Sequence, residues 1–206
     1  MARPEGLPAG PALVLGLGNP GPNYAGTRHN LGSMVVAELA ARLGVGLGRQ
    51  GHHSLWAEAR HAGRKLILAL PQTYMNLSGQ AAASLVRYFD LPTEAVVVVH
   101  DDLDQEPGRL KIALRGGAGG HKGVASLLAH LDGDRFVRLK LGIGRPRFGE
   151  NIEEFVLSGW YADQRGLFEG VVKAAADCLE VILAEGPQAA MQRYHRSNNL
   201  KEEVEG

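Results

Sequence analysis

Apolar residues follow two different spacings along this chain, and segments of the two kinds alternate. Short continuous runs, often β-branched and bounded by glycine, proline or aspartate, are typical of buried strands. They predict strands over residues 12–17, 54–60, 65–70, 95–99, 110–114 and 136–143. Apolar residues three and four positions apart predict helices over residues 30–43, 77–89, 124–130, 164–185 and 187–196. This alternation predicts an α/β fold, a three-layer sandwich around a twisted mixed β-sheet.

The organisation of the chain points to one domain. No internal repeat, low-complexity tract or linker interrupts the 206 residues, and a chain of this length can bury a substantial core without disulfides. We therefore expect a single domain over residues 1–206, with an ordered core over about 12–198 and tails at 1–10 and 199–206.

Cysteine usage and hydropathy bear on the cellular compartment. Cys178 is the only cysteine and lies at helical spacing among apolar residues, so a buried position and a reducing environment are expected. The first ten residues carry no apolar stretch of signal-peptide length, and no later segment is long enough to span a bilayer. These features predict a cytoplasmic protein.

Charge is balanced overall but unevenly distributed. Lysine and arginine number 22, and so do aspartate and glutamate, which argues against a protein coated in positive charge. Residues 107–147 nevertheless hold nine basic and two acidic residues, whereas residues 150–185 hold eight acidic and two basic ones. A basic stretch beside an acidic one predicts a face for a polyanion, although an ordinary solvated surface explains the charge pattern equally well.

Three glycines after the first predicted strand match the spacing G-x-G-x-x-G, at positions 16, 18 and 21. A dinucleotide site requires a helix that opens at these glycines and an acidic residue that ends the next strand. Here no helical pattern starts before about His29, and Glu38 lies inside the predicted helix 30–43. The match is therefore accidental, and what remains is a strand that ends in a rigid turn presenting Asn19.

Two further loop ends suggest acid–base chemistry. His29 lies just before the helix 30–43, and H-D-D-L-D at residues 100–104 follows the β-branched run 95–99. Open α/β sheets place their sites at the carboxyl ends of strands. If Asp101 meets His29, the carboxylate can hold the imidazole as a base in one tautomer. Two alternatives stay open: the acidic residues bind a divalent cation, or they only solvate a loop.

Two more loops carry groups suited to binding. T-Y-M-N-L-S-G at residues 73–79 presents Asn76, which could equally cap the following helix. R-G-G-A-G-G-H-K-G at residues 115–123 exposes backbone N–H groups before a helix. Such groups suit an anion or a substrate backbone, and a hairpin loop without function is the alternative.

Taken together, the motifs G-L-G-N-P-G, T-R-H-N, T-Y-M-N-L-S-G, H-D-D-L-D and G-G-H resemble bacterial-type peptidyl-tRNA hydrolases, in order and in spacing, from about residue 13 to about residue 198. The resemblance implies a phosphorylase/hydrolase-like α/β fold and a monomer. It also implies hydrolysis of the ester between a peptide and the 3′-terminal ribose of tRNA, which recycles chains dropped by stalled ribosomes. No metal or cofactor is implied, and the partner is a nucleic acid, peptidyl-tRNA.

The resemblance also assigns roles to residues. It makes His29 the general base and Asp101 the carboxylate that orients it. The substrate-binding residues it implies are Asn19, Tyr24, Tyr74, Asn76, His121 and Lys122. Lys122 is a departure, because the family usually has asparagine after G-G-H, and Ala118 replaces a histidine common in the glycine-rich loop.

Contacts to tRNA phosphates are expected from the basic stretch. A basic position of the family falls on Ala113, and strand alternation places neighbouring basic residues on the same face. The candidates are Lys111, Arg115, Arg138 and Lys140, with Lys122 as a further one.

Other functions remain as alternatives. A non-catalytic relative that only binds RNA would be expected to lack His29 or Asp101, and this chain has both. A nucleotide-dependent oxidoreductase or transferase lacks support without the helix and the acidic residue. A metal-dependent hydrolase would use the acidic residues 101, 102 and 104. A serine nucleophile is not expected, because G-x-S-x-G is absent from the sequence.

Overall fold

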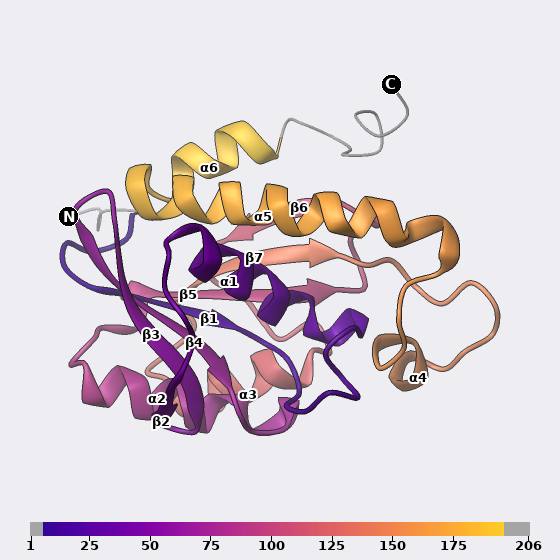
Figure 1. The fold of residues 1–206 in the computed structure, drawn as a ribbon, viewed down its shortest axis with the longest axis horizontal. Coiled ribbons are helices and arrows are strands. Elements are labelled where there is room, and N and C mark those ends of the chain that lie inside the picture. Colours follow the sequence, from indigo (N-terminus) through magenta and orange to yellow (C-terminus); the bar gives the residue numbers. More distant parts are fainter. Residues whose placement is uncertain (1–5, 196–206) are drawn as a thin grey trace.

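The computed structural model describes residues 6–195, which form a seven-stranded mixed sheet with helices on both faces (Figure 1). The strand order is β2-β3-β4-β1-β5-β7-β6. The strands are β1 Ala12–Gly16, β2 Arg49–Gly51, β3 Ser54–His61, β4 Arg64–Pro71, β5 Val96–Asp102, β6 Leu110–Ala113 and β7 Val137–Gly142. The helices are α1 Leu31–Arg42, α2 Ser78–Tyr88, α3 Lys122–His130, α4 Ile152–Val156, α5 Arg165–Glu185 and α6 Pro187–Tyr194.

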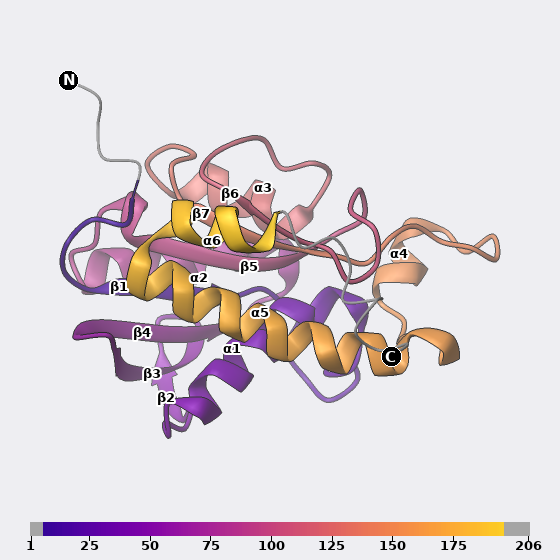
Figure 2. The ribbon, with the colours of Figure 1, turned by 90° about the horizontal axis from the view of Figure 1, so that it is seen from above.

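Alternating side chains of the sheet form two apolar cores. Val14, Val97 and Val99 pack on the side of α1 and α5, together with α6. Leu13, Val96 and Val98 pack on the opposite side against α2 and α3. Figure 1 shows α5 and α6 above the strands and α2 and α3 below them, and in Figure 2, seen from above, α5 and α6 lie in front. The predicted three-layer α/β sandwich is confirmed.

The pairing of the central strands determines where the loops gather. Strand β1 is parallel to both β4 and β5, and β5 is parallel to β7. Antiparallel pairing attaches β3 and β2 at one side of the sheet and β6 at the other. The four parallel strands therefore end at the same edge. The loops with Asn19 and Asn76 therefore meet the end of β5, which carries Asp101, at this edge.

Most predicted elements are present, and the differences have local causes. Strand β5 continues three residues past its predicted end, because His100, Asp101 and Asp102 still pair with β7. Strand β2 and helix α4 were not predicted: β2 is three exposed residues, and α4 is a five-residue helix. The predicted end of the last helix, at residue 196, lies outside the described residues.

The structure describes part of the expected N-terminal tail, and it also describes Cys178, which was expected to be buried. Arg64 Nη1 donates to the carbonyl oxygens of Pro8 and Gly10, at 2.8 and 3.0 Å, and Leu7 packs on the core. Residues 1–5 and 196–206, which include the rest of the expected tails, lie outside the described part. Cys178 is fully buried, which raises the pKa of its thiol to about 12. Among residues 6–195, no helix has the length and apolar character needed to cross a membrane.

Candidate active site

A cavity of about 760 Å³ opens at the edge where the parallel strands end. Its walls come from the loops after β1, β4 and β5, from the glycine-rich loop before α3, and from α4. Every residue expected to bind the peptide or to act on the ester contributes to this lining. They are Asn19, Tyr24, His29, Tyr74, Asn76, Asp101, His121 and Lys122.

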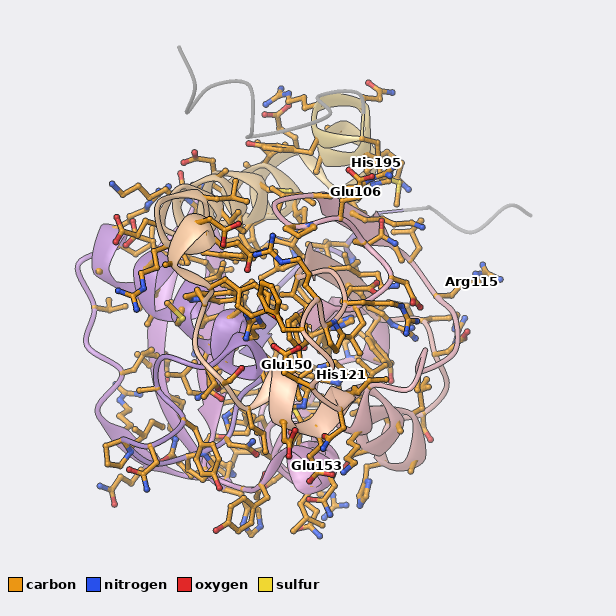
Figure 3. The ribbon with its side chains drawn as sticks, turned by 90° about the vertical axis from the view of Figure 1, so that its right-hand side faces the viewer. Glu106, Arg115, His121, Glu150, Glu153 and His195 are labelled. Carbon is orange, nitrogen blue, oxygen red and sulfur yellow. The ribbon has the colours of Figure 1, made fainter. Side chains whose placement is uncertain are left out.

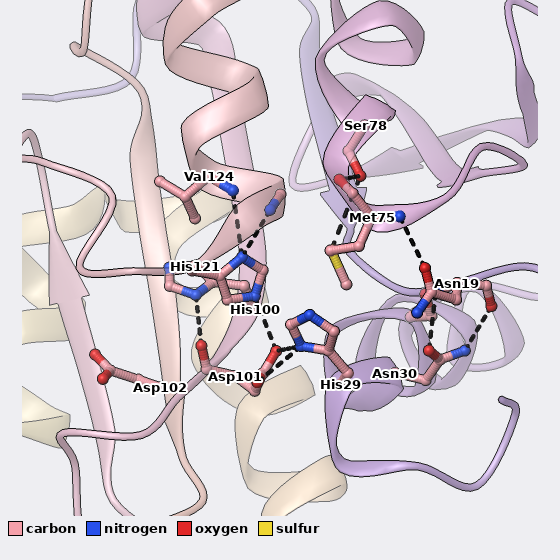
Figure 4. A network of polar contacts seen from close by, with 12 residues as sticks. Asn19, His29, Asn30, Met75, Ser78, His100, Asp101, Asp102, His121 and Val124 are labelled. Carbon is pink, nitrogen blue, oxygen red and sulfur yellow. Dashed lines mark hydrogen bonds and ion pairs between the residues drawn. The ribbon is translucent and has the colours of Figure 1, made fainter. Parts of the chain in front are cut away.

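His29 and Asp101, which both line the cavity, contact each other (Figure 4). His29 Nδ1 lies 2.9 Å from Asp101 Oδ1 and 3.0 Å from Oδ2. His29 comes from the 3₁₀ turn Arg28–Asn30 before α1, and Asp101 comes from the buried end of β5. The expected contact between the two side chains is therefore present, across 72 residues of sequence.

A second histidine, His121, binds the same carboxylate. Its Nε2 lies 2.9 Å from Asp101 Oδ1, and its Nδ1 accepts the backbone N–H groups of Gly123 and Val124 at 3.1 and 3.3 Å. As the N-cap of α3 it can accept only through an unprotonated Nδ1, so its proton is on Nε2 and is donated to Asp101. His121 thus contacts the candidate catalytic carboxylate as well as lining the cavity.

The two imidazoles determine the state of Asp101. Burial alone would raise the pKa of this carboxyl, but the neighbouring His121 and His29 outweigh burial and hold the pKa well below its usual range. An ionised Asp101 accepts the proton of His29 Nδ1, which leaves the lone pair of Nε2 available. The arrangement can therefore accept a proton from a molecule in the cavity.

His100 is a third histidine at this site, and sequence reasoning did not single it out. It is 3 % exposed, and its Nδ1 donates to the carbonyl oxygen of Asp101 at 2.7 Å. Burial, aided by His121, lowers the pKa of His100 to about 3, so the side chain is neutral at physiological pH. Its position next to Asp101 in the H-D-D motif was the available signal.

The two asparagines present amide groups to the cavity. Asn30 bonds reciprocally to the backbone of Asn19, with both distances at 2.8 Å. Asn19 Oδ1 accepts the backbone N–H of Met75 at 2.8 Å, so its Nδ2 is left for a ligand. Asn76 is exposed and is not the N-cap of α2, a position held by Leu77. The alternative of Asn76 as a helix cap is wrong.

The Arg138 side chain on β7 holds the glycine-rich loop by hydrogen bonds to its backbone. This side chain is 3 % exposed, and its guanidinium donates to the carbonyl oxygens of Gly116 and Gly117. Asp134 Oδ2 accepts the N–H of Gly116 at 3.1 Å. Strand alternation correctly put Arg138 on the face of Lys111 and Lys140, but the loop covers its guanidinium. Instead of the expected contact with a tRNA phosphate, Arg138 contacts the glycine-rich loop, which it positions.

The other basic residues differ in how freely they can meet a phosphate. Lys111 is exposed and lies directly opposite Lys140 across the β6–β7 pair. Arg115 extends from the surface (Figure 3). Lys140 is less available, because its Nζ lies 2.5 Å from Asp102 Oδ2. Lys111 and Arg115 therefore remain the open candidates for tRNA contacts.

Lys122, the departure from the family pattern, lies across the cavity from α4. Its Nζ is 3.7 Å from Glu153 Oε2, and both side chains are well exposed. A pair with this exposure contributes little to stability. Lys122 is therefore available to a ligand that displaces Glu153.

A buried arginine joins the loop of His29 to α4. Arg28 is fully buried, and its Nη1 donates to the carbonyl oxygen of Phe155 at 3.1 Å and to Ser158 Oγ at 2.6 Å. Its backbone N–H donates to the carbonyl oxygen of Ser158 at 3.1 Å. The guanidinium also lies 4.0 Å from the centre of the Phe155 ring. This contact could not be predicted from the sequence, because α4 itself was not predicted.

The alternative of a cation site on the acidic residues 101, 102 and 104 is not favoured by their contacts. Asp102 binds Lys140 and Asp104 binds Arg145. Within the described residues, the group with the spacing of metal ligands is instead His29, Asp101 and His121. The two imidazole nitrogens that face Asp101 carry protons in the arrangement above, so they are not free as ligands.

Comparison with known proteins is consistent with this geometry. The family described as peptidyl-tRNA hydrolase matches residues 13–203. The chain is similar to a peptidyl-tRNA hydrolase of Carboxydothermus hydrogenoformans, with 42% identity over 89% of this chain and 98% of the relative. It is also similar to that of Moorella thermoacetica, with 44% identity over 89% and 97%. The crystal structure of peptidyl-tRNA hydrolase from Acinetobacter baumannii is similar with a TM-score of 0.82 and 35% identity, covering 89% of this chain and 94% of that one.

Proposed function

This chain belongs to the peptidyl-tRNA hydrolase family, and on that premise we propose that it hydrolyses the ester between a peptide and the 3′-terminal ribose of tRNA. The products are free tRNA and free peptide, after a ribosome stalls or drops its chain. The observation that carries the proposal is the buried contact between His29 and Asp101 inside a cavity lined by amide groups. We also infer that the protein acts in the cytoplasm as a monomer.

The reaction begins with a water molecule beside His29. Nε2 takes a proton from the water, whose oxygen attacks the ester carbonyl, and ionised Asp101 stabilises the imidazolium that forms. When the tetrahedral intermediate collapses, the C–O bond to the ribose breaks and His29 returns the proton to the ribose oxygen. General-base assistance of this kind contributes about 10²–10⁴-fold in rate.

Amide groups supply the remaining contacts. Asn76 donates to the developing oxyanion, a contact worth about 10²–10³-fold in rate. Asn19 Nδ2 and the N–H groups of the glycine-rich loop bind the peptide backbone. Because these groups contact the peptide backbone and not its side chains, they suit nascent peptides of any sequence. Tyr24, Tyr74 and Lys122 complete the wall around the peptide or the tRNA end.

Turnover of matched substrates tests the activity. The protein is incubated with N-acetylaminoacyl-tRNA and with the same aminoacyl-tRNA bearing a free amino group, in the presence of a chelator. We expect release of free tRNA from the first substrate alone. Hydrolysis of neither substrate contradicts the proposed activity, and loss of turnover in chelator contradicts the metal-free mechanism.

Salt dependence tests the tRNA-binding residues. We expect Lys111→Ala and Arg115→Ala each to weaken tRNA binding and to reduce the slope of log K against log salt concentration by about 1, because each removes one phosphate contact. Lys173→Ala, an exposed lysine on α5, serves as the control with an unchanged slope. Arg138→Ala is expected to leave the slope unchanged while lowering kcat, because its guanidinium holds the loop. A smaller slope for Arg138→Ala would show that Arg138 contacts a phosphate after all. Unchanged slopes for Lys111→Ala and Arg115→Ala would show that these two residues contact none.

A further inference from the structure

One aromatic ring on the loop before α4 is highly exposed to solvent. Phe148 is 76 % exposed, more than the other large apolar side chains in the described part of the chain. It lies on the loop 143–151 between β7 and α4, which extends to the right beyond α4 in Figures 1 and 2. The residues that follow, Ile152 and Glu153, already line the cavity. Phe148 thus lies four positions before the lining residue Ile152, and it belongs to neither apolar core.

A polar network fixes the loop that carries this ring. The Glu150 carboxylate accepts the backbone N–H of Phe148 at 2.9 Å and the hydroxyl of Tyr161 at 2.5 Å. Arg147 Nη2 donates to both oxygens of Asp163, at 2.8 and 2.9 Å. The backbone N–H of Arg147 also donates to the Tyr161 hydroxyl at 3.3 Å. Figure 3 shows Glu150 on the same side of the molecule as His121 and Glu153, which line the cavity. These contacts hold the backbone segment that carries the ring.

The surroundings of the ring leave most of it accessible. Phe148 contacts Tyr161 edge-on, with ring centres 5.1 Å apart and planes at 81°. The Arg147 guanidinium lies 5.6 Å from the Phe148 ring centre and 4.5 Å from that of Tyr161. An exposed aromatic ring beside a guanidinium is the combination on which unpaired nucleobases stack.

We propose that Phe148, together with Arg147, is a stacking site for an unpaired nucleobase in the single-stranded 3′ end of tRNA. The proposal rests on the proposed function, which brings that end to His29 past the entrance of the cavity. Every nucleotide has a π face, whereas only some peptide residues carry an apolar side chain. Stacking therefore suits an enzyme that must accept many tRNAs and peptides.

Kinetics of three variants test the site. With N-acetylaminoacyl-tRNA as substrate, Phe148→Ala is expected to raise KM by about 5- to 150-fold, the equivalent of one lost base stack, with kcat unchanged. Phe148→Trp keeps a stacking surface and is expected to retain a KM within about two-fold of the unmodified protein. Tyr88→Ala removes an aromatic side chain that is 63 % exposed at the end of α2, and is expected to change neither constant.

A spectroscopic measurement reports stacking without turnover. Deacylated tRNA with 2-aminopurine at the unpaired 3′ positions, one at a time, is expected to lose fluorescence on binding at one position. This quenching is expected to disappear with saturating Phe148→Ala. Unchanged KM and unchanged quenching overturn the proposal. A KM increase confined to substrates with long apolar peptides also overturns it, because the ring then contacts the peptide. Absent turnover by the unmodified protein would instead contradict the proposed function.

Discussion

The substitution His29→Ala is expected to lower kcat by about 10²- to 10⁴-fold, because it removes the group that takes the proton from water. The affinity for tRNA should change by less than about two-fold, since His29 is buried in the cavity lining and the residues proposed to contact tRNA phosphates are other, exposed side chains. Single-turnover hydrolysis of N-acetylaminoacyl-tRNA and equilibrium binding of deacylated tRNA measure the two quantities separately.

A matched control separates the loss of the base from a general disturbance. His61→Ala removes a histidine at the end of β3, remote from the cavity lining, and is expected to retain full activity. Substantial hydrolysis by His29→Ala would remove His29 as the base. A loss of tRNA affinity equal to the loss of kcat would assign it to binding instead.

The second large effect is expected from Asp101→Asn. The carboxylate accepts one N–H from His29 and one from His121, whereas an amide has one acceptor oxygen and one donor NH₂. One imidazole therefore faces a donor, and His29 is no longer held in the tautomer that leaves Nε2 free. We expect kcat to fall by about 10²- to 10⁴-fold. The free energy of unfolding is expected to fall by about 1–3 kcal/mol, because a buried donor loses its acceptor.

A double variant tests whether Asp101 acts through His29. If it does, His29→Ala combined with Asp101→Asn loses no more activity than His29→Ala alone. Asp132→Asn, on the exposed turn after α3, is the control for the change of charge. Full multiplication of the two losses would mean that Asp101 assists hydrolysis independently of His29. Wild-type activity in Asp101→Asn would show that the Asp101 carboxylate is not needed for hydrolysis.

The parts of the fold that depend on local pattern could be predicted from the sequence. The β-branched run 95–99 and the helical spacing of residues 30–43 each correspond to an observed element, because burial on one or both faces imposes these spacings. Placement at strand ends also brought His29 and Asp101 together in the prediction, since parallel strands end at one edge of the sheet.

What could not be predicted depends on contacts between distant segments. Alternation gives the face on which Arg138 lies, but it does not reveal that the glycine-rich loop folds over that face. The sharing of Asp101 by His121 depends on where α3 begins, and two backbone N–H groups determine the protonated nitrogen. Helix α4, with five residues, is too short for periodicity to identify.

The contact between Arg28 and α4 has a mechanical consequence. Arg28, the residue before His29, donates hydrogen bonds to Phe155 and Ser158. These bonds connect the loop that carries His29 to the wall of the cavity formed by α4. We expect a displacement of that wall to shift the backbone between Arg28 and His29. Occupancy of the cavity and orientation of the His29 imidazole would then be coupled through the Arg28 guanidinium.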